Sequence, residues 1–171
     1  VIQQYFQQIS KLSRNAKLYL VATTVQGLSY GIWGVIFYLY LNLNEIGFKP
    51  DFISYMFTVN ALATGFIALP AGLICEHLGP KKVLLIGLTA NFISLIQIIF
   101  LQPSILLFAS LASGLIGTLA WVASAPFMVE NSRQEERTYL FSIDWSIMII
   151  MGVIGSYIGG LMPDLLNSFL G

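Results

Sequence analysis

The chain has 171 residues, a formal net charge of zero, and only 9% charged residues against 57% hydrophobic ones. A soluble domain carries about 25% charged residues, so this chain lacks the charge to cover a surface in water. The basic residues form no continuous face, so nucleic acid is not expected as a partner, and the single cysteine excludes a disulfide framework. The composition predicts a membrane protein surrounded by a lipid bilayer.

Five apolar runs are long enough to cross the roughly 30 Å core of a bilayer, for which a helix needs about 20 residues. In chain order they cover residues 18–41, 52–75, 83–101, 104–128 and 139–162. None alternates polar and apolar residues, and backbone polar groups in lipid must be paired within their own segment, so each run is predicted to be helical. The predicted fold is all-α, with a cytoplasmic N-terminal segment, 1–17, before a transmembrane domain, 18–171.

Basic residues fall almost entirely on one side of the predicted membrane. Seven of the eight flank the first run or lie in the second and fourth connections: Lys11, Arg14, Lys17, Lys81, Lys82, Arg133 and Arg137. Lys49 alone falls on the other side. Cytoplasmic loops carry the excess of Lys and Arg, so we predict a cytoplasmic N-terminus in a multi-pass protein of the plasma membrane.

Glycines recur at helix-packing spacing in the first and fifth runs. One face of the first run carries Gly27, Gly31 and Gly34, and one face of the fifth carries Gly152, Gly155 and Gly159, with Gly160 beside it. Small residues on one face let membrane helices approach closely. These faces are therefore predicted to pack against other helices.

Residues 72–82, GLICEHLGPKK, separate the second and third runs. They resemble the signature loop of the major facilitator superfamily, which reads Gly, three residues, Asp, Arg or Lys, any residue, Gly and then basic residues. The matching positions are Gly72, Glu76, Gly79, Lys81 and Lys82. Glu76 replaces the usual Asp, His77 replaces the usual cation, and Pro80 stands where a basic residue is frequent. Gly79 is predicted to take a positive φ in this turn.

The resemblance implies a cytoplasmic gate. In such transporters an acid at the end of span four pairs with this loop, a role that would fall to Glu130, and Arg137 lies in the connection that follows. By that resemblance Glu130 would face His77 or Lys81, and a pH-sensing role is the alternative for His77. These transporters have twelve spans in two six-helix halves of inverted repeats. The chain would then be an N-terminal fragment of five spans whose missing partner is the C-terminal half of the same chain.

Two further segments bear on ion coupling. Residues 155–160, GSYIGG, resemble the fifth-span signature of proton-coupled antiporters, with Ser156 in place of Pro. Ser110 stands where the fourth-span signature of drug exporters has Arg, which argues against a drug:proton antiporter. The first likeness favours proton-coupled export, and a facilitator without ion coupling is the alternative.

Asp144 is an ionisable residue inside the fifth run. A charged side chain within a span normally faces protein or water, because contact with lipid is unfavourable. At about 100° per residue, Asp144, Met148, Met151 and Gly155 share one stripe of the helix. Two interpretations stay open. Asp144 binds a proton or a cationic substrate, or it joins a charge cluster near the cytoplasm that contains Glu130, Arg133 and Arg137.

Polar and aromatic residues mark candidate positions for a solute. The first run carries a stripe of such residues, the second carries Asn60 and the fourth Trp121; the stripe consists of Gln26, Tyr30, Trp33, Phe37 and Tyr40. Such side chains bind organic molecules by stacking and hydrogen bonding. The alternative is that they only pack between helices.

The resemblance implies a secondary active transporter that moves a small organic solute, with protons as a possible second substrate, by alternating access. A complete five-span subunit for assembly or signalling is the alternative from another class. No enzyme, cofactor or metal site is expected. The single His cannot form a two-histidine metal site, and no Gly-rich phosphate loop or nucleophile with a neighbouring base is found.

Overall fold

The structure of the protein is a computed structural model that describes residues 12–42 and 47–170, with 164–170 described by their backbone. Helices account for nearly all of these residues, and no strand occurs among them: α2 (Arg14–Asn42), α3 (Pro50–Leu78), α4 (Pro80–Leu88), α5 (Ala90–Ile99), α6 (Pro103–Glu130) and α7 (Arg137–Leu170). Taking α4 and α5 together, five segments of the described chain are long and apolar enough to cross a membrane. This confirms the predicted all-α membrane fold.

The chain divides into two compact units. Unit 1 contains α2 as far as Tyr40, the end of α6 from Met128, and α7. Unit 2 contains residues 41–127, and thus α3, α4, α5 and most of α6.

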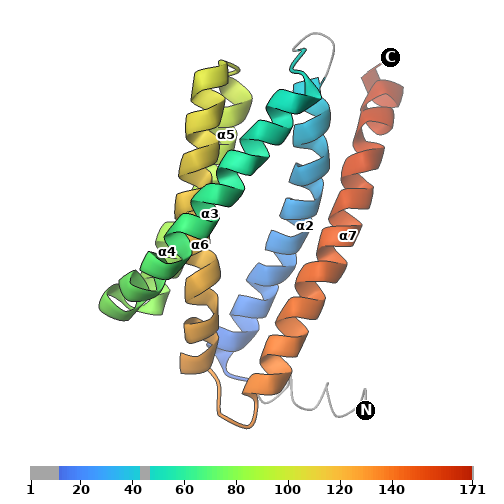
Figure 1. Ribbon diagram of the computed structural model, residues 1–171. Coiled ribbons are helices and arrows are strands. Elements are labelled where there is room, and N and C mark those ends of the chain that lie inside the picture. The colour runs from blue at the N-terminus through green and yellow to red at the C-terminus, as the bar shows by residue number, and fades with distance from the viewer. Residues whose placement is uncertain (1–11, 43–46, 171) are drawn as a thin grey trace. The chain divides into compact units, whose positions relative to one another are not determined.

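In unit 1, α2 lies beside α7 (Figure 1). A Cβ atom built at Gly27 would lie 3.0 Å from the backbone oxygen of Met148, and one at Gly31 would collide with the backbone of Gly152 and Ser156. Because the contact advances four residues along both helices, α2 and α7 run parallel. First and fifth spans of an up-and-down chain must run in the same direction, so this orientation fits five crossings.

The glycines of α7 differ in how closely they approach α2. A Cβ atom at Gly155 would collide with the backbone oxygen of Leu28, and one at Gly159 would lie 3.0 Å from that of Ile32. Gly34 and Gly160 have open space at the Cβ position. Close helix contact therefore involves Gly27 and Gly31 of α2 and Gly155 and Gly159 of α7.

Apolar residues close one end of unit 1. Leu12, Ala16 and Leu20 pack with Met128 of α6 and Leu140 of α7, and all five side chains are buried. Their spacing of four residues on α2 keeps them on one helix face. This cluster joins three segments that are distant in the sequence.

In unit 2, a tight turn connects α3 to α4. Gly79 has φ of 84°, a value that residues with a Cβ rarely adopt, and Pro80 begins α4. The predicted positive φ is thereby confirmed. Cys75 and Val83, on either side of the turn, pack against Ala123 of α6.

The third span is a helix in two parts, which the sequence did not predict. The break falls at Thr89, whose backbone N–H and side-chain hydroxyl both donate to Ile86 O, at 3.0 and 2.6 Å. Both parts approach α6 through small residues. A Cβ atom at Gly87 would collide with the backbone of Ala120, and one at Gly117 would lie 3.6 Å from Ala90.

Large apolar side chains are exposed along the helices. Phe66 and Leu69 of α3 are 81% and 85% exposed. Surfaces of this kind are unfavourable in water, and they match the hydrocarbon of a bilayer.

Candidate functional site

Asp144 of α7 is joined to α2 by a side-chain hydrogen bond. Thr23 Oγ1 donates a hydrogen bond to Asp144 Oδ1 at 2.7 Å. Thr23 is 5% exposed and lies four residues before Gly27, on the face of α2 that meets α7. The carboxylate therefore lies between the two helices rather than on a lipid-facing surface.

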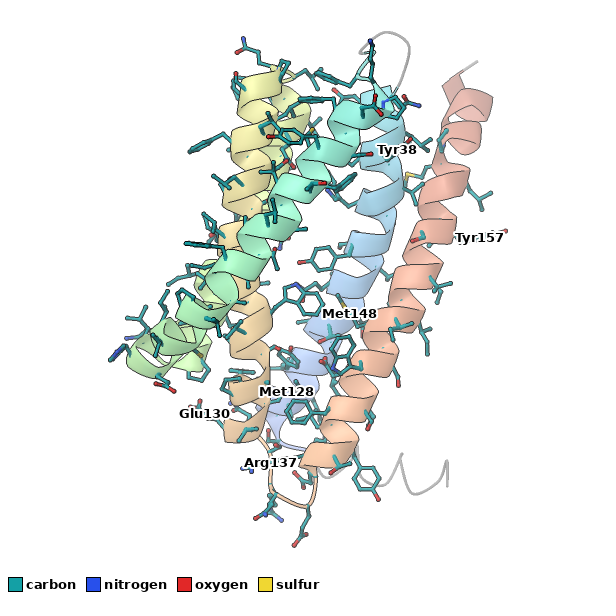
Figure 2. The ribbon with its side chains drawn as sticks, in the orientation of Figure 1. Tyr38, Met128, Glu130, Arg137, Met148 and Tyr157 are labelled. Atoms are coloured by element: carbon teal, nitrogen blue, oxygen red, sulfur yellow. The ribbon has the colours of Figure 1, made fainter. Side chains whose placement is uncertain are left out.

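The surroundings of Asp144 contain no partner of opposite charge among the described residues. One turn before it, Leu140 is fully buried, and one turn after it Met148 lies against Gly27. Figure 2 labels Met148 on α7, and it labels Glu130 and Arg137 at the end of unit 1. The ion-pair cluster considered for Asp144 is not formed by the residues that the structure describes.

The predicted stripe on α2 forms a polar and aromatic face. Gln26 Nε2 donates to Tyr30 Oη at 3.3 Å, and Tyr30 is 40% exposed. The rings of Trp33 and Phe37 stack, with their centroids 4.9 Å apart and an angle of 15° between their planes. Phe37 is buried, whereas Trp33 is half-buried. The part of this face at Gln26 and Tyr30 offers hydrogen-bonding groups without a formal charge.

A second polar cluster joins three helices of unit 2. Asn60 Nδ2 of α3 donates to Ser110 O at 3.0 Å and to Ser113 Oγ at 2.9 Å, both on α6. Gln97 Nε2 of α5 donates to Ser110 Oγ at 2.9 Å. Gln97 and Ser110 are buried. Ser110, which stands where the drug exporters have Arg, therefore belongs to an uncharged network in this protein. Trp121, the other residue predicted in this region, is 49% exposed.

The loop between α3 and α4 presents its charged groups to solvent. Glu76, His77, Lys81 and Lys82 are all exposed. A Cβ atom at Gly72 would meet nothing within 4 Å in the described structure.

A hollow of about 490 Å³ opens at the end of unit 1 where α2 begins. Its lining contains two acids, two arginines and four smaller polar residues: Glu130, Glu136, Arg14, Arg133, Ser13, Asn15, Asn131 and Ser132. Ser13 Oγ donates to Asn131 O at 2.6 Å, and Asn15 Nδ2 donates to Asn131 Oδ1 at 2.7 Å. Glu130 belongs to unit 1 and the 72–82 loop to unit 2, so their pairing stays a prediction.

Arg137 begins α7 beside this hollow. Its Nη2 donates to Val129 O at 3.3 Å, and its Nε is buried without a hydrogen-bond partner. Arg137 therefore holds the start of α7 against the end of α6 through this hydrogen bond, which is a structural role.

Sequence reasoning missed Thr23, Gln97 and Glu136. Thr23 continues the glycine face of the first run by one turn, and Gln97 is a polar residue inside an apolar run. The sequence pattern therefore indicated that both side chains could face another helix. Glu136 is 7% exposed and accepts a hydrogen bond from the backbone N–H of Arg133 at 3.2 Å. Nothing in the sequence around it indicates that burial.

Metal ligands do not gather anywhere in the described part of the chain, where no group of three His, Cys, Asp or Glu residues could hold an ion. The sequence model of the family described as Major Facilitator Superfamily matches residues 19–168. Comparison with curated proteins and with solved structures gave no significant match.

Proposed function

The chain belongs to the major facilitator superfamily, and from this premise we propose that it works in a secondary transporter that moves a small organic solute in exchange for protons. Its five membrane-length helices are most of the six-helix N-terminal half of that fold. Alternating access moves one half against the other around a site near the middle of the membrane. The C-terminal half of the same chain would supply the rest of the solute pathway.

The observation that carries proton exchange is the position of Asp144. An ionisable residue inside a span is unfavourable in lipid, and here it lies between α2 and α7 with a hydroxyl as its partner. A structural carboxylate would be expected to pair with a cation, and Arg133 and Arg137 are charged residues of the same unit. The absence of such a pair among the described residues supports a carboxylate that takes up and releases a proton.

The solute would bind beside the face of α2 formed by Gln26, Tyr30 and Trp33. These residues provide an amide, a phenol and an aromatic ring, which suit an uncharged or weakly polar organic molecule. Asn60 is hydrogen-bonded within the cluster of unit 2, and a contribution of Asn60 or Trp121 to solute binding stays a prediction. The GSYIGG sequence, residues 155–160, favours export as the direction of transport.

The basic residues favour a cytoplasmic N-terminus in the plasma membrane. In that orientation the 72–82 loop and Glu130 would form part of the cytoplasmic gate, with His77 as the usual cation's substitute. The exposed acid and cations of that loop would be available to pair in one of the two states of the transporter.

The test measures solute flux and proton movement in proteoliposomes that contain the full-length protein. The solutes are a panel of lipophilic cations, sugars and organic acids. We expect substrate-induced proton movement that Asp144→Asn abolishes. Asp51→Asn is the matched control, because Asp51 is exposed in the first turn of α3. Solute flux without proton movement would instead identify a facilitator and contradict the role of Asp144.

A further inference from the structure

The hydroxyl of Thr23 has two acceptors within hydrogen-bonding distance. Asp144 Oδ1 lies 2.7 Å from Thr23 Oγ1, and the backbone oxygen of Tyr19, one turn earlier on α2, lies 3.2 Å from it. A hydroxyl carries one hydrogen and two lone pairs, so it donates to one of these oxygens at a time. Its hydrogen therefore has two alternative positions.

We propose that Thr23 is a positioning residue that pairs with Asp144 in both protonation states of the carboxyl group. This inference rests on the proposed function, in which Asp144 exchanges protons. When Asp144 is ionised, Thr23 donates its hydrogen to the carboxylate. When Asp144 takes up one proton from water, the hydroxyl rotates, donates to Tyr19 O and accepts the new O–H of Asp144. Thr23 loses no proton in this cycle.

Partial burial favours such a partner. Thr23 is 5% exposed and Asp144 is half-buried between the helices, and a polar group withdrawn from water without a hydrogen bond is unfavourable. A Lys or Arg partner would stabilise only the ionised form, and a backbone N–H could not accept from the neutral acid. A hydroxyl serves both forms without movement of either helix.

The helix contacts on both sides hold the two oxygens in register. Leu20 and Leu140 are buried one turn before the pair, and Gly27 meets Met148 one turn after it. The other charged residues whose side chains the structure describes in unit 1 are Arg14, Lys17, Glu130, Arg133, Glu135, Glu136 and Arg137. The hydrogen bond that the described structure gives Asp144 comes from Thr23, so the pairing is local.

Thr24 provides a matched control on the same helix. Its hydroxyl donates to Leu20 O at 2.9 Å, the same bond to the preceding turn that Thr23 can form with Tyr19 O. In the described structure the hydroxyl that bonds to Asp144 is that of Thr23, not that of Thr24. Replacing Thr24 by Val removes a hydroxyl from α2 without changing the environment of the carboxyl group.

The experiment combines infrared difference spectra over a pH titration with proton-driven flux, both on the full-length protein in proteoliposomes. The wild type should show a carboxylic acid band that Asp144→Asn removes. Thr23→Val should move the frequency of that band and lower proton-coupled flux about tenfold, since both forms of Asp144 lose the hydroxyl that pairs with them. Thr23→Ser should keep both within about twofold of the wild type, and Thr24→Val should leave both unchanged.

Thr23→Ala, which also lacks the hydroxyl, is measured alongside in case Thr23→Val does not fold. A band at the wild-type frequency in either variant, with wild-type flux, would overturn the role of Thr23 while leaving proton exchange at Asp144 intact. A wild-type spectrum without any band that depends on Asp144 would contradict the proposed proton site itself. The two failures are therefore distinguishable.

Discussion

Polar side chains meet between helices in both units, and the pair of Thr23 and Asp144 in unit 1 differs in charge and connectivity from the cluster around Ser110 in unit 2. In unit 1, one carboxyl and one hydroxyl join two helices at Thr23 and Asp144. In unit 2, the amides of Asn60 and Gln97 and the serines of α6 join three helices without a charge. A neutral network that connects three helices has one favourable arrangement of its hydrogen bonds, so it holds the helices in one packing. A carboxyl group paired with a hydroxyl has two favourable arrangements, one for each protonation state, so the carboxyl can gain or lose a proton while the helices stay in place.

The largest effect is expected from a bulky residue at the closest contact of unit 1. Gly31→Leu would force its side chain into the backbone of Gly152 and Ser156, and should lower the free energy of unfolding by about 3 kcal/mol. Unfolding in detergent by a chemical denaturant measures this. Gly34→Leu is the control, because its Cβ would meet open space. Equal stability of the two variants would contradict the close contact of α2 with α7.

A matched substitution tests whether unit 2 depends equally on glycine. Gly87→Leu would collide with the backbone of Ala120, and we expect a loss of about 2 kcal/mol in the free energy of unfolding. The loss should be smaller than in unit 1, because α4 is only nine residues long and ends at the break at Thr89, where it can shift. Gly65→Leu is the control, because a Cβ atom at Gly65 would meet open space. A loss of free energy of unfolding in Gly87→Leu larger than that in Gly31→Leu would reverse the comparison between the units.

The sequence predicted the five spans because each requires only length and an apolar composition. It did not predict where the helices end: α2 begins at Arg14 rather than near residue 18, since a helix continues beyond the hydrocarbon wherever its polar residues reach water. The break at Thr89 was also missed. Thr occurs in unbroken helices too, so only the bond of its hydroxyl to Ile86 O marks the position.

The sequence predicted one half of the candidate site, the position of Asp144 on its helix, but not the residue that pairs with it. Helical periodicity placed Asp144 on the same stripe as Met148 and Gly155, and both of these residues lie against α2. Its partner Thr23 is 121 residues away in the sequence, and pairing them requires the register between α2 and α7. That register depends on which glycines meet, and a sequence shows the glycine faces without showing their alignment.

The neutral network of unit 2 should contribute a moderate stability that does not depend on pH. Asn60→Leu removes two hydrogen bonds, but Ser113 Oγ still donates to Ser110 O, so the loss should be about 1 kcal/mol. Because no member of the cluster titrates, the loss should be equal at about pH 5 and about pH 8. Asn91→Leu, at an exposed position of α5, is the control. A loss that changed with pH would contradict the contrast between the units.

The smallest effect is expected for Asp144→Asn, whose stability should stay within about 0.5 kcal/mol of the wild type. The amide can donate to Thr23 Oγ1 while the hydroxyl donates to Tyr19 O, so Asn reproduces the neutral form of the pair. A double-mutant cycle of Asp144→Asn with Thr23→Val should therefore give a coupling of about zero, because Asn keeps a hydrogen bond to Thr23, and such bonds between membrane helices contribute about 0.6 kcal/mol on average. A loss of several kcal/mol on Asp144→Asn alone would make the carboxylate a structural group, since a site that exchanges protons must be stable in its neutral form.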